Sequence, residues 1–499
     1  MIEKTDYIPP ELVLIFDPEA QIRISEGKLV AKVDIAPLIG LLDSAHAAIE
    51  PLFGSSEQNK ADSTTLMGVD QPLDLSVFHK VSAYHEKLTS MAERFRELSF
   101  VQAAYLKPSA EIGIIEERRK PGKKRSTSAK RTKDLTDKKD FTDKQEYLKP
   151  AAEGGIDADF AWKQDGGGGQ GIHVIDIEGA WNFKHEDLVY NPSSCIGGVS
   201  VSSRKWRRHG TAVLGVLAGD HNTFGINGIC PDADVCTVSI FDNANADPSP
   251  HWGSAKAIKS AADRLSPGDI ILLELHRPGP AVNFEENEQN QFGYIPVEWW
   301  PCDLAAILYA TQRGIIVVEA GGNGTQNLCD DIYNQNPESP HGPFPPWWVN
   351  PFKRNPIDTA AILVGAGVPP PGTHGTNLGP DCSRAKISNF GVVIDAQGWG
   401  VEVATCGGNN NLGEEGDPEN RHYTSVFSGT SSAAAMVAGA VCCLQGVLKT
   451  KNKSLLPKQA RALLRDHNLG SPQQNGPLGP AHAEPIGPRP DLMRLINLF

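Results

Sequence analysis

The sequence predicts an α/β fold with a mostly parallel, doubly wound sheet and helices on both faces, preceded by a small α+β region. From about residue 155 onward, short apolar runs alternate with helix-like patterns. The runs are apolar at successive positions, which is typical of strands that are covered on both faces. Strands that alternate with helices form parallel sheets through right-handed crossovers. In such sheets the chemistry gathers at the carboxyl ends of the strands.

The individual elements of this sheet follow from the same pattern. We expect strands at 171–177, 235–241, 269–275, 314–320 and 361–367. The helix-like segments between them are 209–218, 252–265 and 303–311.

The first hundred residues carry a different mixture of patterns. Strand-like runs occur at 11–16 and 28–35, and helix-like runs occur at 35–49 and 78–95. We therefore expect three parts along the chain, namely an α+β region at 1–112, a basic low-complexity linker at 113–145 and the α/β domain at 146–499.

The linker is marked by its charge and by repeats. Residues 118–133 contain nine basic side chains and no acidic one, whereas the formal net charge of the whole chain is -13. A charge run of this kind is typical of a solvated segment. Nucleic-acid binding is the weaker alternative, because no aromatic residues interleave for base stacking. The near copies A-Y-L-K-P-S-A-E (104–111) and E-Y-L-K-P-A-A-E (146–153) flank the linker.

The composition favours a soluble globular protein. Of the 499 residues, 40% are hydrophobic and 21% are charged. The N-terminus lacks the basic start and long apolar run of a secretory signal, and we expect no apolar stretch that could span a bilayer. An intracellular protein without a membrane partner is the resulting prediction. Nine cysteines lie between Cys195 and Cys443 without a C-x-x-C pair, so we expect mostly small core residues rather than zinc ligands or a complete disulfide framework.

Four polar residues stand where predicted strands end or helices begin. Asp176 ends the first run, His209 begins a helix, and Asn323 lies in a glycine-rich turn. Ser431 belongs to the run F-S-G-T-S-S-A-A-A-M-V-A-G-A at 427–440. Each residue type also has a purely structural use, because Ser caps helices, Asn occupies turns and Asp binds loop amides. All four nevertheless lie at strand ends or helix starts of one predicted parallel sheet, and this conjunction makes them candidate site residues.

The motifs around these residues resemble those of subtilisin-like serine proteases over about residues 146–499. They are V-I-D and H-E-D-L near Asp176, H-G-T-A-V-L-G-V-L-A-G at His209, G-N-G at Asn323 and S-G-T-S-S-A at Ser431. The resemblance implies that Ser431 attacks a peptide carbonyl, that His209 takes its proton and that Asp176 holds the imidazole in the required tautomer. Asn323 and the Ser431 N–H would donate to the oxyanion.

The sequence departs from the family pattern beside the expected cleft. E-L-H-R at 274–277 stands where S-L-G-G is usual, and Glu319 replaces a small residue before A-G-G-N. The resemblance therefore implies a set of substrate-contacting residues, namely Glu274, Leu275, His276, Arg277 and Glu319. The carboxylates of Glu178, Glu274 and Glu319 would favour basic substrate residues, unless they bind only to loops or to one another.

The resemblance also implies a role for the N-terminal region. Such proteases carry inhibitory propeptides whose last strand lies in the substrate cleft, and 103–108 and 146–150 are the two candidates for that strand. The chain would then be a zymogen that is cut in the basic linker and acts on proteins or peptides. The alternative is an inactive subtilisin-like scaffold that binds peptides. No cofactor has a motif here, although calcium is common in the family and the acidic stretch 328–336 could hold it.

Overall fold

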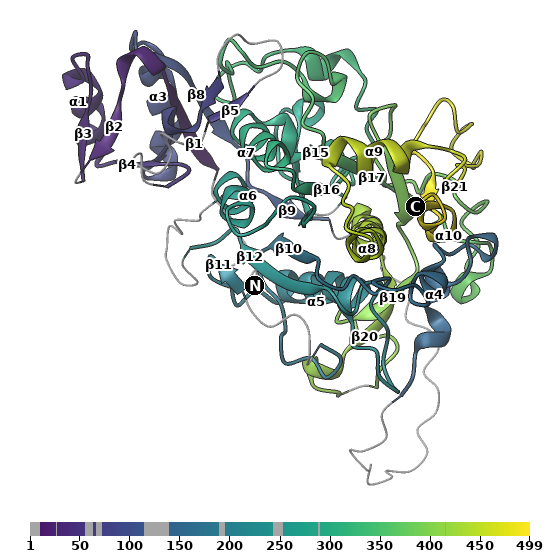
Figure 1. The fold of residues 1–499 in the computed structure, drawn as a ribbon. Helices are drawn as coiled ribbons and strands as arrows, with labels where there is room; N and C mark the ends of the chain where they lie inside the picture. Colours follow the sequence, from purple (N-terminus) through teal and green to yellow (C-terminus); the bar gives the residue numbers. More distant parts are fainter. Residues whose placement is uncertain are drawn as a thin grey trace.

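The fold comes from a computed structural model, in which the N-terminal strands and helices lie to one side of a larger α/β body (Figure 1). The structure describes residues 10–25, 27–54, 63–65, 72–113, 139–188, 195–242, 253–287, 290–414 and 416–499. The predicted basic run at 118–133 lies outside these residues.

A parallel sheet of seven strands forms the centre of the larger body. Its order is β11-β12-β10-β13-β16-β17-β18, and all neighbouring strands are parallel. The strands are β10 (His173–Glu178), β11 (Cys195–Gly197), β12 (Asp234–Ser239), β13 (Ile270–Leu273), β16 (Ile316–Ala320), β17 (Ile362–Gly367) and β18 (Ala396–Trp399). All the strands predicted for this sheet are present, so the predicted α/β fold is confirmed.

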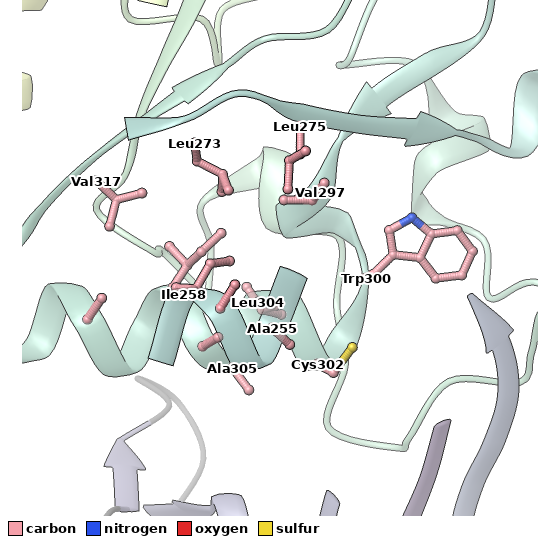
Figure 2. Close-up of a cluster of buried hydrophobic side chains, with 14 of the residues drawn as sticks. Ala255, Ile258, Leu273, Leu275, Val297, Trp300, Cys302, Leu304, Ala305 and Val317 are labelled. Carbon is pink, nitrogen blue, oxygen red and sulfur yellow. The ribbon is translucent and has the colours of Figure 1, made fainter. Parts of the chain in front are cut away.

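Hydrophobic side chains cover both faces of this sheet, which explains why its strands are continuous apolar runs. On one face, Leu273 and Val317 belong to a buried cluster with helices α6 (Ser254–Ala262) and α7 (Pro301–Gln312), part of which Figure 2 shows. Helices α5 (Arg204–Ala218) and α8 (Thr430–Thr450) cover the other face, in a cluster that contains Val174 and Leu272.

Helix α8 corrects one prediction from composition. Among the helices that the structure describes, it is the one long and apolar enough to cross a membrane, yet its apolar window is 100% buried inside the structure. The chain therefore does contain an apolar stretch of membrane-spanning length, and the fold uses it as a core helix. The prediction for the cysteines is confirmed, because all nine are free and six of them are buried.

The N-terminal region forms an antiparallel sheet of order β4-β7-β1-β8. Its strands are β1 (Glu11–Phe16), β4 (Ala48–Pro51), β7 (Phe78–Ser82) and β8 (Val101–Lys107). Helices α1 (Ala36–Ala45) and α3 (His85–Arg96) share a buried cluster with this sheet. A small α+β region is therefore present, as the sequence predicts.

Two elements of this region differ from the prediction. The segment predicted as one helix at 78–95 begins with strand β7, and only the part from His85 is helical. Pairing with β1 on one side and β4 on the other satisfies the backbone of β7, so tertiary contacts override the local pattern. The strand predicted at 28–35 is limited to β3 (Lys28–Val30), which pairs with β2 (Arg23–Ser25).

After β8 the chain enters the larger body and adds a strand to it. Strand β9 (Glu111–Ile112) pairs antiparallel with β14 (Leu275–Pro278), which also pairs with β15 (Tyr294–Pro296). Neither predicted candidate is this inserted strand. Residues 103–107 belong to β8, and Tyr147 lies in the 3-10 turn η4 (Glu146–Leu148), where its ring packs against Trp399.

The end of the predicted linker is also packed. Phe141 is buried, and Gln145 donates from Nε2 to the Asn227 carbonyl at 2.7 Å. The linker predicted at 113–145 therefore ends earlier than expected, because residues 139–145 already belong to the larger body.

A buried histidine in the loop after β10 makes stability depend on pH. The Nε2 of His185 lies 2.8 Å from the His422 carbonyl, and its Nδ1 accepts from the Asp187 N–H at 3.3 Å, so the ring is neutral. Burial lowers the pKa of His185 from 6.5 to about 4. The unfolded chain therefore binds this proton first, and stability falls as the pH drops from about 6.5 to about 4, by up to about 3 kcal/mol.

We expect His185→Gln to remove this contribution. The variant should be less stable than wild type at pH 7, and the gap in unfolding free energy should narrow as the pH falls toward 4. Denaturant titration at several pH values measures this gap, and replacement of the exposed His482 by Gln is the control. A gap that stays constant across the range would show that His185 does not titrate on unfolding.

Candidate active site

His209 and Glu178 form the first pair of the site. His209 lies in α5, whose first turn is capped by the Ser203 side chain, and Glu178 is the last residue of β10. The imidazole Nδ1 lies 2.8 Å from Glu178 Oε2, and both side chains are completely buried. When Nδ1–H donates to the carboxylate, Nε2 keeps its lone pair and can accept a proton. The Phe427 ring packs edge-on against the imidazole, with centroids 5.5 Å apart.

Burial controls the protonation of this pair. It lowers the pKa of His209 to about 3, an effect to which the Lys205 ammonium adds. Burial also raises the pKa of Glu178 well above its ordinary value. Both shifts disfavour charge on the pair while the site is closed to water.

Asp176 does not contact His209, which corrects the sequence prediction of the acid. Its Oδ2 accepts from the Trp181 indole N–H at 2.7 Å, and burial raises its pKa, as does the neighbouring Glu178. Asp176 and Glu178 share one face of β10 because side chains two apart in a strand point the same way. Glu178 lies about 6–7 Å farther along the strand, and it is the carboxylate that reaches the imidazole.

Ser431 lies in the first turn of α8, where backbone N–H groups have no partner within the helix and the helix dipole is positive. Its Oγ is buried and faces the Glu274 carboxyl group, although among the described residues it has no partner with full hydrogen-bond geometry. The neighbouring Ser432 is different, because its hydroxyl contacts the Trp399 and Gly429 carbonyls at 2.8 and 2.9 Å. Ser432 is thus a packing residue, and Ser431 has the hydroxyl available for chemistry.

Asn323 follows β16 and is held in one orientation by the start of α8. Its Oδ1 accepts from the Thr430 N–H at 2.9 Å and from the Thr430 hydroxyl at 3.0 Å. The amide nitrogen Nδ2 therefore points away from Thr430, and it donates to Gln291 Oε1 at 3.3 Å. This arrangement leaves a fixed N–H donor beside Ser431.

Glu274 brings a third carboxyl group to the site. It directly follows β13, whose pairing with β10 places it next to Glu178 at the carboxyl edge of the sheet. The side chain is buried, and its pKa is raised well above the ordinary value by burial and by the charges of Glu178 and Asp176, while the Ser431 hydroxyl acts in the opposite direction. Glu274 thus adds a third buried carboxyl group at the carboxyl edge of the sheet.

The chain's own segment 108–113 lies across these groups. In the pairing of β9 with β14, Glu111 is opposite His276 and Ile112 is opposite Leu275, so the following Gly113 comes level with Glu274. A Cβ atom built on Gly113 would lie 2.8 Å from Asn323 Nδ2 and 3.0 Å from Ser431 Oγ. An extended segment of the chain itself thus lies over these groups, with Gly113 next to Ser431.

Comparison with known proteins identifies the family of this chain. Residues 180–481, more than half of the chain, match the model of the Subtilase family. The chain belongs to the subtilase family. The match contains His209, Asn323 and Ser431, and it begins just after Glu178.

The curated relatives of this subtilase are proteases of distant sequence. An extracellular protease of Xanthomonas campestris is 25% identical over 306 residues, which are 60% of this chain and 41% of the relative, so the chain spans less than half of that protein. Subtilisin Savinase of Lederbergia lenta is 24% identical over 308 residues, 61% of this chain and 86% of the relative. Among solved structures, the keratinolytic enzyme fervidolysin of Fervidobacterium pennivorans shares the fold, with a TM-score of 0.52 and 16% identity over 100% of this chain and 62% of that one.

A buried network of charges holds the N-terminal region of this subtilase against the larger body. The Lys107 ammonium is completely buried, 3.3 Å from Glu11 and 3.4 Å from Asp303. Arg277 lies 3.5 Å from the same Asp303 and donates to the Pro108 carbonyl. Arg277, predicted to contact the substrate, thus contacts the inserted segment of the chain itself.

The side chain of Gln291 contacts the inserted segment, and that of His276 contacts Asn323 beside it. Gln291 donates from Nε2 to the Ile112 carbonyl at 2.9 Å, and His276 Nδ1 accepts from the Asn323 N–H at 3.2 Å. Burial lowers the pKa of His276 to about 3, so the ring stays neutral. The sequence identified His276 because it follows the third predicted strand, whereas Gln291 lies in no motif and was missed.

Glu319 does not join the other carboxylates. It is a buried residue of β16 and accepts from the Glu298 N–H at 3.2 Å. Burial and the charge of Glu298 raise the pKa of Glu319 well above its ordinary value. Of the three glutamates that were predicted to form one basic-selective cleft, Glu178 and Glu274 are therefore neighbours, whereas Glu319 lies apart from both. In the stretch 328–336, Asp330 and Asp331 accept from Asn327 and Asn334, and no group of three potential metal ligands occurs among the described residues.

Proposed function

We propose that this subtilase is a serine endopeptidase whose full-length chain is a zymogen, inhibited by its own residues 108–113. Protein or peptide chains are its substrates, and they bind where the inserted segment now lies. The observation that carries the proposal is the position of Gly113, which directly follows strand β9 and lies close to both the side-chain amide of Asn323 and the hydroxyl of Ser431.

The proposal assigns a residue to each step of peptide hydrolysis. His209 Nε2 takes the proton of Ser431 while Oγ bonds to the carbonyl carbon of the substrate. The same proton then passes to the amide nitrogen as the C–N bond breaks, so that the amine leaves and the acyl group stays on Oγ as an ester. Glu178 keeps the proton of the imidazole on Nδ1, which fixes the tautomer. Asn323 Nδ2 and the backbone N–H groups at the start of α8 stabilise the negative charge on oxygen. Water releases the acyl group by the same route.

The inserted segment supports the inhibited state. Both His209 Nε2 and Ser431 Oγ are buried without a partner of full hydrogen-bond geometry among the described residues. Catalytic hydrogen bonds are often unmade until a substrate is bound in a productive geometry. Removal of residues 108–113 would admit water and substrate to both atoms.

Labelling with a fluorophosphonate probe tests the proposal. We expect little labelling of the full chain, and strong labelling at Ser431 after limited trypsin cleavage in the basic run and separation of the N-terminal fragment. Ser431→Ala and His209→Ala should abolish the labelling. Ser432→Ala is the matched control, because its hydroxyl only contacts the Trp399 and Gly429 carbonyls, and it should keep the labelling.

Other outcomes separate the two parts of the proposal. Strong labelling of the uncut chain would contradict inhibition and leave the protease assignment intact. Absence of labelling in both forms would contradict catalysis and favour a scaffold that only binds peptides.

A further inference from the structure

The inserted segment shows which residue of a bound peptide meets the nucleophile. Its pairing with β14 is antiparallel, with Glu111 opposite His276 and Ile112 opposite Leu275. The next residue, Gly113, is therefore the one beside Glu274 and Ser431. A Cβ atom on Gly429 would lie 2.5 Å from the Gly113 carbonyl oxygen and 3.1 Å from Asn323 Nδ2. The carbonyl of Gly113 thus lies next to the start of α8 and Asn323, where an oxyanion would form.

This position has no room for a side chain. A Cβ atom on Gly113 would approach Asn323 Nδ2 to 2.8 Å, which is closer than real Cβ contacts. The backbone of Gly113 is not in the left-handed region, so its conformation alone would admit other residues. The restriction comes from the surrounding atoms.

Those atoms cannot easily move away. Asn323 is 1% exposed, and two hydrogen bonds from Thr430 hold its Oδ1 while Gln291 binds its Nδ2. Gln291 is also 1% exposed and binds the Ile112 carbonyl. A larger residue would have to displace this whole network, and such overpacking of a close-packed site is unfavourable.

The two preceding positions have recognition elements of their own. Ile112 is completely buried and belongs to the same hydrophobic cluster as Leu275 and Trp300. Glu111 accepts from the Tyr294 hydroxyl at 2.8 Å, and Lys205 lies 3.8 Å from its other oxygen. The cleft therefore fits an aliphatic residue after an acidic one, whereas the sequence predicted a preference for basic residues.

We propose that this cleft is selective for peptides with glycine at the residue whose carbonyl Ser431 attacks, preceded by an aliphatic residue and, one position earlier, by an acidic residue. The part of this inference that concerns cleavage rests on the proposed endopeptidase function. The preference for glycine at this position is itself a binding property, so it can be measured without catalysis.

The first experiment measures how tightly the full chain holds the inserted segment, by hydrogen exchange of the backbone amides of residues 109–113. Gly113→Ala should increase their exchange rates about 10- to 100-fold, because overpacking shifts the segment toward release. The matched control is Gly40→Ala in α1, where a Cβ atom meets nothing within 4 Å, and it should leave these rates unchanged. Unchanged exchange in Gly113→Ala would overturn the proposal.

The second experiment measures selectivity with the trypsin-cut chain after separation of the N-terminal fragment. Fluorogenic peptides based on residues 108–116, Pro-Ser-Ala-Glu-Ile-Gly-Ile-Ile-Glu, carry Gly, Ala or Val at the position of Gly113. We expect kcat/KM to fall about 10- to 100-fold from Gly to Ala, and further for Val. Equal cleavage of the Gly and Ala peptides would overturn the selectivity while leaving the protease intact. If the cut chain cleaves no peptide and is not labelled by the fluorophosphonate, the endopeptidase function is contradicted. Hydrogen exchange would then still show whether the position of Gly113 is selective for glycine.

Discussion

Glu178→Gln is expected to lower the kcat of the trypsin-activated protease by about 10⁴-fold, with little change in KM. The glutamine keeps the shape of the side chain but can turn an N–H toward His209, which would favour the tautomer with the proton on Nε2. That tautomer cannot accept the proton of Ser431. Because Glu178 Oε2 lies 2.8 Å from Nδ1 and is completely buried, water does not replace the lost acceptor.

Asp176→Asn is the matched control for Glu178. The amide oxygen of asparagine can still accept from the Trp181 indole N–H, which Asp176 Oδ2 contacts at 2.7 Å. We expect less than about a 10-fold loss in kcat, since no contact to His209 is removed. Active-site titration normalises both variants, and thermal unfolding verifies that each is folded. The reverse result, with Asp176→Asn inactive and Glu178→Gln active, would restore Asp176 as the orienting acid.

Asn323→Ala is expected to lower kcat by about 10²–10³-fold and to leave KM nearly unchanged. In the proposed mechanism the amide Nδ2 donates to the oxyanion, so its loss should affect the transition state more than the bound substrate. Removal of the side chain also leaves the buried Thr430 N–H without its acceptor, and stability should fall by about 1–3 kcal/mol. Steady-state kinetics on peptide substrates, with denaturant titration beside them, measure the two effects separately.

Two further variants test whether the loss of activity is specific to the Asn323 side chain. Thr430→Val removes the hydroxyl that contacts Asn323 Oδ1 at 3.0 Å but keeps the backbone N–H, so we expect a smaller loss of about 10-fold in kcat. Asn327→Ala, on the same loop but bound to Asp330, should keep full activity. A rise in KM at constant kcat for Asn323→Ala would mean that this amide only binds the substrate.

The parallel sheet was predictable because the patterns that specify its strands and helices lie within short stretches of the sequence. Strands buried on both faces must be apolar throughout, and helices must separate them for the strands to be parallel. The same rule located His209, Asn323 and Ser431 at the carboxyl edge of the sheet. Glu178 lies at this edge as well, as the last residue of β10, which was the signal that could have identified it in place of Asp176.

What the sequence did not reveal depends on contacts between distant segments. The two-residue strand β9 has no periodicity, and it exists because β14 offers it a free edge. The segment 78–82 has a helix-like pattern that pairing with β1 and β4 overrides. Gln291 reaches the site through a loop without a motif, and Arg277 contacts Pro108 far earlier in the chain. Residues of this kind become visible only when the fold brings their partners together.

The burial of α8 has a consequence for the dynamics of the protease. Its first nineteen residues, Thr430 to Leu448, are all buried, so the backbone of Ser431 cannot open without disrupting the centre of the molecule. Local fluctuations that would misplace the nucleophile therefore cost nearly as much as global unfolding. The inserted segment, in contrast, adds only the two-residue strand β9 to the body. In the proposed zymogen, release of this segment would therefore expose Ser431 without opening the helix that carries it.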